Sequence, residues 1–311
     1  MDIAVPIVKD ETSDARYNSA GEEQTQVTPS ATAIMGVEDL TPLSLAPAGT
    51  RIQYGDDPLQ FGELSLPAGR VGSDHPVVIN VHGGCWLSEY PIDHSRALAR
   101  ALAGSGFAVW NIEYRRVGDS GGGWPGTFED VAAAADFIRK LAEPYRLDLA
   151  RVVLMGHSAG GQLALWLACR KRIPRRSVLA ARDPLPVRGV VALAPATELV
   201  ELYEQQVYDG VIGKLLGGSP REVPERFDAV VPSRLAPSGI PQHVITGRHD
   251  SEWGWHGPAY VRAIENLETA PVRLVEIEDA GHYELIAPSS NAWKQVEKSV
   301  SGMLNLSRAT N

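Results

Sequence analysis

The stretch RVVLMGHSAGGQLALWLAC, residues 151–169, decides the fold of this chain. The apolar residues 152–155 lead into GHSAGG, and a second apolar segment of helix-forming residues follows directly. This order predicts a strand, a tight turn and a helix, with Ser158 at the turn and a glycine two residues to either side. Such a turn displays the serine hydroxyl instead of burying it. An ordinary strand-to-helix turn without a catalytic role is the alternative interpretation.

The rest of the chain alternates between strands and helices. Two short stretches, residues 51–54 and 61–67, predict an antiparallel hairpin at a sheet edge. Buried strands are expected at residues 77–81, 107–112, 152–155, 187–193, 242–246 and 272–277. Helices are expected at residues 94–103, 128–141, 159–169, 258–267 and 291–304. Strands separated by helices of this length predict an α/β fold, with a mostly parallel central sheet and helices on both faces.

Two segments interrupt this alternation. Residues 1–40 are largely polar and show no sustained period, which predicts an N-terminal arm that is loosely ordered or packed on the body. Residues 41–311 are expected to form a single α/β domain, because the length of the chain suits one large core. Within that domain, residues 198–236 lack a clear strand. We expect this insertion to form a cap over the site.

Composition and charge limit the partners. The net charge of −9 and the pI near 5.4 argue against nucleic acid and against an anionic membrane surface. No run of residues is long enough to span a bilayer, and the first residues resemble neither a secretory signal nor a transit peptide. The two cysteines, Cys85 and Cys169, are interpreted as free thiols in a reducing cytoplasm. A small neutral or weakly polar molecule is the more plausible partner, and a homodimer is left open.

Three residues that lie far apart in the sequence predict a catalytic triad. A serine hydroxyl is a weak nucleophile at neutral pH, so it needs a base within hydrogen-bond reach and an acid that orients the base. Asp250 and His282 each follow a predicted strand, at the edge where open α/β sheets build their sites. The chain order Ser158, Asp250, His282 is the order expected for a nucleophile at a strand-to-helix elbow.

Other residues compete for these roles. Glu198 follows the preceding strand and could stand in for Asp250, and Asp279 is close to His282 in the sequence. An aspartate at position 250 could also simply cap a helix. The rival bases are His243, His249 and His256.

The sequence HGGCW, residues 82–86, predicts an oxyanion hole. Two glycines after a buried strand allow the main chain to turn its amides toward the elbow. The amides of Gly84 and Cys85, together with that of Ala159 at the helix start, are the expected donors. Gly83 supports the turn, and His82 is expected to pin the loop through its ring. Three tryptophans are candidates for lining a substrate pocket: Trp86, Trp253 and Trp255. No substrate-binding residue is assigned, and no metal or organic cofactor is expected because no cluster has ligand spacing.

These motifs resemble the α/β-hydrolase superfamily, in the branch of hormone-sensitive-lipase-like carboxylesterases and kynurenine formamidases. The sequence HGGCW is similar to the H-G-G-x-W motif of the formamidases, and GHSAGG is similar to their elbow. GRHDSEW and GHYELI resemble the segments that carry the acid and the histidine. The resemblance implies that Gly84 and Cys85 supply oxyanion amides, although lipase-like members have glycine where Cys85 stands.

The sequence therefore predicts a serine hydrolase that cleaves a small carboxylic ester or an aryl formamide through an acyl-enzyme on Ser158. Two alternatives remain open. An acyltransferase would use the same triad and pass the acyl group to an acceptor, and a binding protein could keep the fold without catalysis.

Overall fold

The computed structural model describes residues 34–43, 46–68 and 74–305 of the 311-residue chain. Most of the predicted N-terminal arm, residues 1–33, lies outside the described residues. Its last part belongs to a short 3-10 helix, η1 (Val37–Leu43), whose Leu40 is buried.

Eight strands form one sheet in the order β1-β2-β4-β3-β5-β6-β7-β8. They are β1 (Thr50–Gln53), β2 (Phe61–Ser65), β3 (His75–Val81), β4 (Ala108–Ile112), β5 (Leu147–His157), β6 (Gly189–Leu193), β7 (Gln242–Gly247) and β8 (Val272–Ile277). The pairs β1–β2 and β2–β4 are antiparallel, and every other pair is parallel. The predicted edge hairpin and the mostly parallel sheet are both confirmed.

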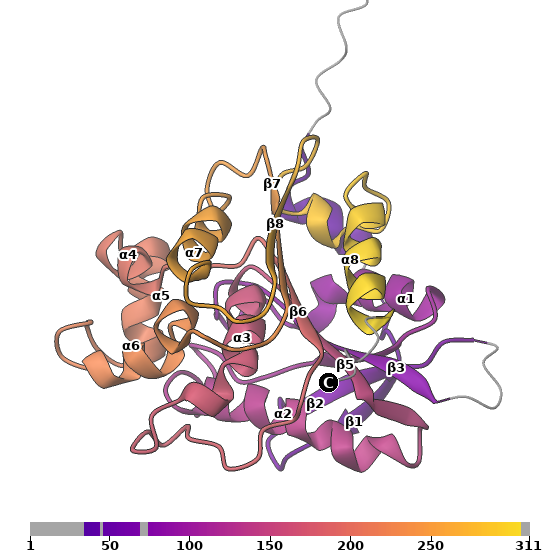
Figure 1. Cartoon of the computed structure of the whole chain (residues 1–311), viewed down its shortest axis with the longest axis horizontal. Coiled ribbons are helices and arrows are strands. Elements are labelled where there is room, and N and C mark those ends of the chain that lie inside the picture. Colours follow the sequence, from indigo (N-terminus) through magenta and orange to yellow (C-terminus); the bar gives the residue numbers. More distant parts are fainter. Residues whose placement is uncertain (1–33, 44–45, 69–73, 306–311) are drawn as a thin grey trace, which may run out of the picture. The chain divides into compact units, whose positions relative to one another are not determined.

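Helices cover both faces of the sheet, as predicted (Figure 1). One face carries α1 (Arg96–Gly104) and α8 (Trp293–Asn305). The other carries α2 (Gly126–Ala142), α3 (Ala159–Ala168) and α7 (His256–Ile264). The remaining described segments include the short 3-10 helices η2 (Ile92–Ser95), η3 (Arg170–Arg172) and η5 (Glu284–Ile286).

Two hydrophobic cores, one on each face of the sheet, result from the alternation of side chains along the strands. On β3, Val77 and Ile79 face the core shared with α2 and α3, whereas Val78 faces the core shared with α1 and α8. The same alternation places Leu154 and Met155 of β5 in opposite cores. Successive side chains of a strand point to opposite faces, so a strand covered on both sides is apolar throughout.

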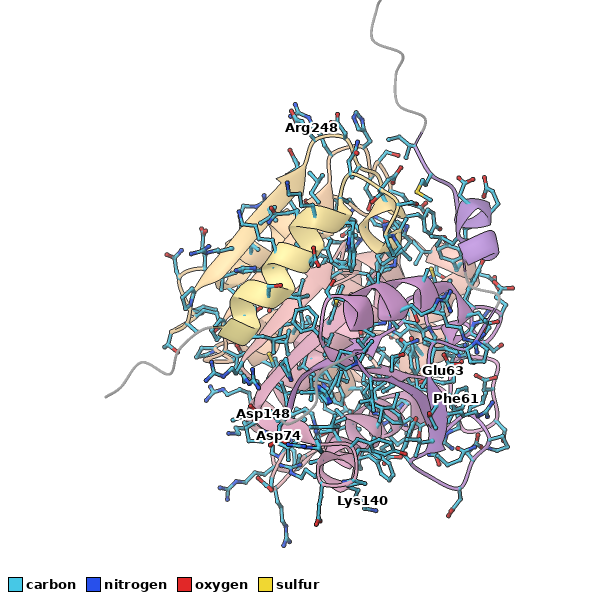
Figure 2. All side chains as sticks on the ribbon, turned by 90° about the vertical axis from the view of Figure 1, so that its right-hand side faces the viewer. Phe61, Glu63, Asp74, Lys140, Asp148 and Arg248 are labelled. Atoms are coloured by element: carbon cyan, nitrogen blue, oxygen red, sulfur yellow. The ribbon has the colours of Figure 1, made fainter. Side chains whose placement is uncertain are left out.

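The direction of the parallel strands brings the chemically interesting loops to one edge. Asp74 and Asp148 lie close together at the amino ends of β3 and β5, far from Arg248, which follows the carboxyl end of β7 (Figure 2). The segments after β3, β5, β7 and β8 leave the sheet at the edge marked by Arg248.

The predicted insertion is helical. It consists of α4 (Leu199–Glu204), α5 (Val207–Leu216), α6 (Pro224–Val230) and η4 (Pro232–Leu235). Two side chains of α3 attach it to the domain: the indole of Trp166 donates to the Ala229 carbonyl at 2.9 Å, and the amide of Gln162 donates to the Val230 carbonyl at 2.9 Å. None of the helices in the described part of the chain is long and apolar enough to cross a membrane.

Candidate active site

Ser158 occupies a strained turn between β5 and α3. Its backbone has φ 54° and ψ −120°, a conformation that costs a residue with a side chain on the order of 1–3 kcal/mol. The flanking glycines are required by close approach. A Cβ on Gly156 would lie 2.1 Å from the Gly160 carbonyl oxygen, and a Cβ on Gly160 would lie 2.1 Å from that of Val81. The sequence therefore folds here into the sharp elbow expected from its glycines.

A cavity of about 420 Å³ opens beside this elbow. It is lined by Ser158 and His282, by Gly84 and Cys85 of the loop after β3, and by several aromatic side chains. The structure thus brings together, around one hollow, residues from the predicted elbow, the predicted oxyanion loop and the predicted histidine loop. A volume of this size suits a small organic substrate.

Asp250 and His282 form a close pair. The Nδ1 atom of His282 lies 2.6 Å from Oδ2 of Asp250, and the other carboxylate oxygen accepts the Trp253 amide at 2.8 Å. An ionised carboxylate only accepts hydrogen bonds, so the His282 proton sits on Nδ1 and the lone pair sits on Nε2. This tautomer leaves Nε2 as the nitrogen that can accept a proton. Asp250 is 8% exposed, which keeps water from competing for the pair.

His157, which the sequence analysis did not single out, holds the backbone of the histidine loop. Its Nε2 lies 3.0 Å from the carbonyl oxygen of His282, and the two rings are 4.4 Å apart at their centroids. A carbonyl oxygen can only accept, so His157 donates. Burial lowers the pKa of His157 well below its usual value, and the neighbouring His282 and His94 lower it further. A neutral His157 is therefore both a spacer and a hydrogen-bond donor for His282.

The loop after β3 lies directly against the elbow. A Cβ on Gly83 would come within 2.8 Å of the His157 carbonyl oxygen and 3.3 Å of the Ser158 Cβ. Among the described residues, the amides of Gly84, Cys85 and Ala159 donate to no protein acceptor. Amides without a partner next to a nucleophile are the donors that a tetrahedral oxyanion needs.

A buried ionic network holds the loop after β3 in place. The His82 ring contacts the Gly83 carbonyl through Nδ1 and the Glu113 carboxylate through Nε2, both at 2.8 Å. Arg116 is 3.4 Å from the same carboxylate, and the Ile92 amide donates to it at 2.9 Å. Burial alone would raise the pKa of Glu113, but His82 and Arg116 outweigh burial and lower it. Glu113 therefore stays ionised and keeps the His82 ring in place.

The side chain of Cys85 meets the insertion. Its thiol is hydrogen-bonded to the hydroxyl of Tyr208, near the start of α5, and both residues line the cavity. Burial raises the pKa of Cys85 to about 12, so the thiol is neutral. The backbone at Cys85 has φ 51°, a left-handed conformation that glycine adopts without strain. Tyr208 is the contribution of residues 198–236 to the cavity wall.

The three tryptophans have different surroundings. Trp86 is fully buried, and its indole donates to the Gln162 side chain at 3.3 Å, so it belongs to the core. Trp253 lines the cavity beside His282, with ring centroids 6.2 Å apart. Trp255 is 41% exposed and stacks on His256 at 3.9 Å.

The residues that compete with Asp250 and His282 lie outside the cavity wall. None of the five rivals is among the described residues that line it: Glu198, Asp279, His243, His249 and His256. The Glu198 amide donates to Nδ1 of His256 at 3.2 Å, which ties these two residues to each other. Burial lowers the pKa of His256 to about 4, so its ring is neutral at pH 7.

Glu284 is a second residue that the sequence analysis did not find. Its carboxylate accepts the Gly281 amide at 2.9 Å and, through the other oxygen, the Met35 amide at 2.6 Å. The segment before η1 is thereby attached to the loop that carries His282. The contact with Met35 has no local sequence signal, because Met35 and Glu284 are 249 residues apart.

The described residues contain no group of three His, Cys, Asp or Glu side chains that could hold a metal ion.

The sheet order and the serine elbow define an α/β-hydrolase. The BD-FAE family model matches residues 63–252, which is more than half of the chain and includes Ser158 and Asp250. The chain belongs to this family, and the predicted relationship to the carboxylesterases of the α/β-hydrolase superfamily is confirmed.

Individual relatives agree with this assignment. Esterase LipC of Mycobacterium tuberculosis is 30% identical over 114 residues, covering 37% of this chain and 28% of LipC. A probable isoprenylcysteine alpha-carbonyl methylesterase of Oryza sativa is 33% identical over 118 residues, covering 36% of this chain and 26% of the rice protein. The chain thus spans less than a third of either relative. The structure of esterase B from Lactobacillus rhamnosis superimposes with a TM-score of 0.71 at 23% identity, covering 86% of this chain and 90% of that one.

Proposed function

We propose that this protein is a serine esterase that hydrolyses small carboxylic esters. The observation that carries the proposal is the 2.6 Å contact between Nδ1 of His282 and Oδ2 of Asp250, in a cavity that His282 shares with Ser158. The match to a family of hydrolases and the names of the relatives, which are esterases, support the same reaction class.

In the proposed first step, the Ser158 hydroxyl attacks the ester carbonyl while Nε2 of His282 takes its proton. Asp250 stabilises the imidazolium that forms and holds the ring in the required tautomer. The negative charge on the carbonyl oxygen is received by the amides of Gly84, Cys85 and Ala159. Losing one such donor typically costs on the order of 3 kcal/mol of transition-state stabilisation.

In the proposed second step, His282 returns the proton to the leaving alcohol and an acyl-enzyme remains on Ser158. A water molecule, deprotonated by His282, then attacks the acyl group and releases the carboxylic acid. An aryl formamide would be cleaved by the same steps, with an amine as the leaving group. The HGGCW stretch, which is similar to the formamidase motif, is the observation that keeps this second substrate class in the proposal.

The proposal is tested by covalent labelling and by product analysis. A fluorophosphonate should label Ser158, as identified by peptide mass spectrometry, and should abolish hydrolysis of 4-nitrophenyl acetate. Absence of labelling and of hydrolysis would favour a binding protein on this fold. Assays with N-formylkynurenine and with added acceptor alcohols separate formamide cleavage and acyl transfer from ester hydrolysis.

A further inference from the structure

The wall of the cavity carries carboxylates without a matching cation. Two of its lining residues, Glu89 and Asp93, are acidic, and among the described lining residues none is lysine or arginine. Asp93 is paired with Arg96 at 2.9 Å. Glu89 is exposed and takes part in no ion pair within the described chain; its carboxylate is hydrogen-bonded to the hydroxyl of Tyr90.

A second exposed carboxylate lies close to the same wall. Glu252 precedes Trp253, and no described cation pairs with it. Burial raises the pKa of Cys85, Tyr208 and Tyr283, and the charge of Glu252 raises each of them further. The negative field of Glu252 therefore reaches three side chains that line the cavity.

The cations that could offset this field are engaged elsewhere. Arg116 is 2% exposed and is paired with Glu113 and Asp119 at 3.4 and 3.3 Å. Two histidines of the wall, His94 and His157, do not supply a resting charge either. Burial lowers the pKa of His94 to about 3, and it lowers that of His157 well below its usual value.

Aromatic rings complete the wall next to the catalytic histidine. Tyr208 and Trp253 have nearly parallel rings whose centroids are 6.1 Å apart, and Tyr208 is 40% exposed. The ring of Tyr283 meets His282 edge-on at 5.2 Å. Aromatic faces attract ammonium groups, and a cleft with one sign of charge raises the local concentration of ligands of the opposite sign.

We propose that the cavity selects esters that carry an ammonium or quaternary ammonium group, in the acyl or the alcohol portion, over neutral esters of the same shape. The aromatic wall of Tyr208, Trp253 and Tyr283 contacts the cation, and the carboxylates of Glu89 and Glu252 attract it. The proposal rests on the proposed function, because it names the substrate class of the same site.

The test compares substrates that differ only in charge. Acetylcholine and 3,3-dimethylbutyl acetate form one matched pair, with nitrogen replaced by carbon. The 4-nitrophenyl esters of 4-(trimethylammonio)butanoate and 5,5-dimethylhexanoate form the other, with the charge on the acyl side. In at least one pair, kcat/KM of the cationic ester should exceed that of the neutral ester by about 5-fold or more at low ionic strength. The ratio should fall in 0.5 M NaCl, where screening shortens the reach of the carboxylates.

Variants identify the groups responsible. Glu89→Gln and Glu252→Gln should each lower the cation-to-neutral ratio about 2-fold, and Tyr208→Leu should lower it more than Tyr208→Phe, which keeps the ring. Glu265→Gln is the matched control: it removes one exposed carboxylate outside the cavity wall and should leave the ratio unchanged.

Failure of this inference and failure of the proposed function give different results. If the neutral esters are hydrolysed through Ser158 but neither pair shows a preference for the cation, the charge selection is wrong and the esterase proposal stands. An equal decrease of the cation-to-neutral ratio in Glu265→Gln would also overturn the proposed charge selection. The decrease would then reflect the net charge of the protein alone and not the carboxylates near the cavity. If no ester is hydrolysed and the fluorophosphonate does not label Ser158, both proposals fall.

Discussion

The two sides of the cavity are held in different ways. The side with Ser158 and Gly84 rests on the sheet, on close-packed glycines and on the buried pair of His82 and Glu113. The side with Tyr208 comes from an inserted segment, and Tyr208 itself is 40% exposed. The difference teaches that Ser158 and Gly84 are positioned by the core. Tyr208, in contrast, belongs to a segment whose residues can change without disturbing the core.

The largest effect is expected on the core side. Ser158→Ala should lower kcat for 4-nitrophenyl acetate by about 10⁴-fold or more, because the members of a triad act as a unit. The melting temperature should not fall, since the Ser158 hydroxyl forms no hydrogen bond with any of the described residues. Steady-state kinetics and thermal unfolding of the same preparation check both points. Activity within 10-fold of the original would mean that another residue is the nucleophile.

The next effect concerns stability. Glu113→Ala should lower the free energy of unfolding by about 3–5 kcal/mol, because it leaves Arg116 and His82 buried without their carboxylate. Asp228→Ala is the control, since it breaks an exposed pair with Arg234 and should cost less than about 1 kcal/mol. Urea unfolding followed by fluorescence measures both. Equal losses in the two variants would mean that the buried Glu113 network stabilises the fold no more than an exposed ion pair does.

A smaller effect depends on pH. The pKa of His94 is about 3 in the folded state, because burial disfavours the imidazolium, and near 6.5 in the unfolded chain. The unfolded state therefore binds more protons between these values, and the stability due to neutral His94 is lost as the pH falls below about 6.5. His94→Gln should reduce the slope of unfolding free energy against pH by up to about 1.4 kcal/mol per unit between pH 4 and 6. Urea unfolding at several pH values measures the slope, and an unchanged slope in His94→Gln would mean that His94 does not carry this pH dependence.

The smallest effect is expected on the exposed side. Tyr208→Ala should change the ratio of kcat/KM for butyrate and acetate esters by about 3- to 10-fold, because it enlarges the space beside Cys85. Tyr208→Phe removes only the hydroxyl that meets the thiol and should change the ratio less. Neither variant should shift the melting temperature as Glu113→Ala does. A large loss of stability in Tyr208→Phe would show that the insertion is part of the core.

The sequence predicted most of the architecture, because strands buried on both faces are apolar and glycines mark sharp turns. The helix predicted at residues 258–267 begins at His256, and the strand predicted at residues 152–155 extends back to Leu147. The added residues of β5 include the half-exposed Asp148 and Arg151, whose polar side chains hid the strand.

For the site, Ser158, Asp250 and His282 were predicted to lie together because each follows a predicted strand. The structure places all three at one edge of the sheet. The roles of His157 and Glu284 could not be predicted in this way. Both act through backbone groups, one on the His282 carbonyl and the other on the Met35 and Gly281 amides. A contact with a backbone group does not depend on the residue type of the partner, so the sequence does not indicate it. Only the folded chain shows which segments lie together.

The link between Met35 and Glu284 has a consequence for the order in which the protein matures. During synthesis, Glu284 is added to the polypeptide 249 residues after Met35, whose amide its carboxylate accepts. All eight strands of the sheet precede Glu284 in the sequence. The loop that carries His282 therefore receives its brace from Glu284 only after every strand has been synthesised.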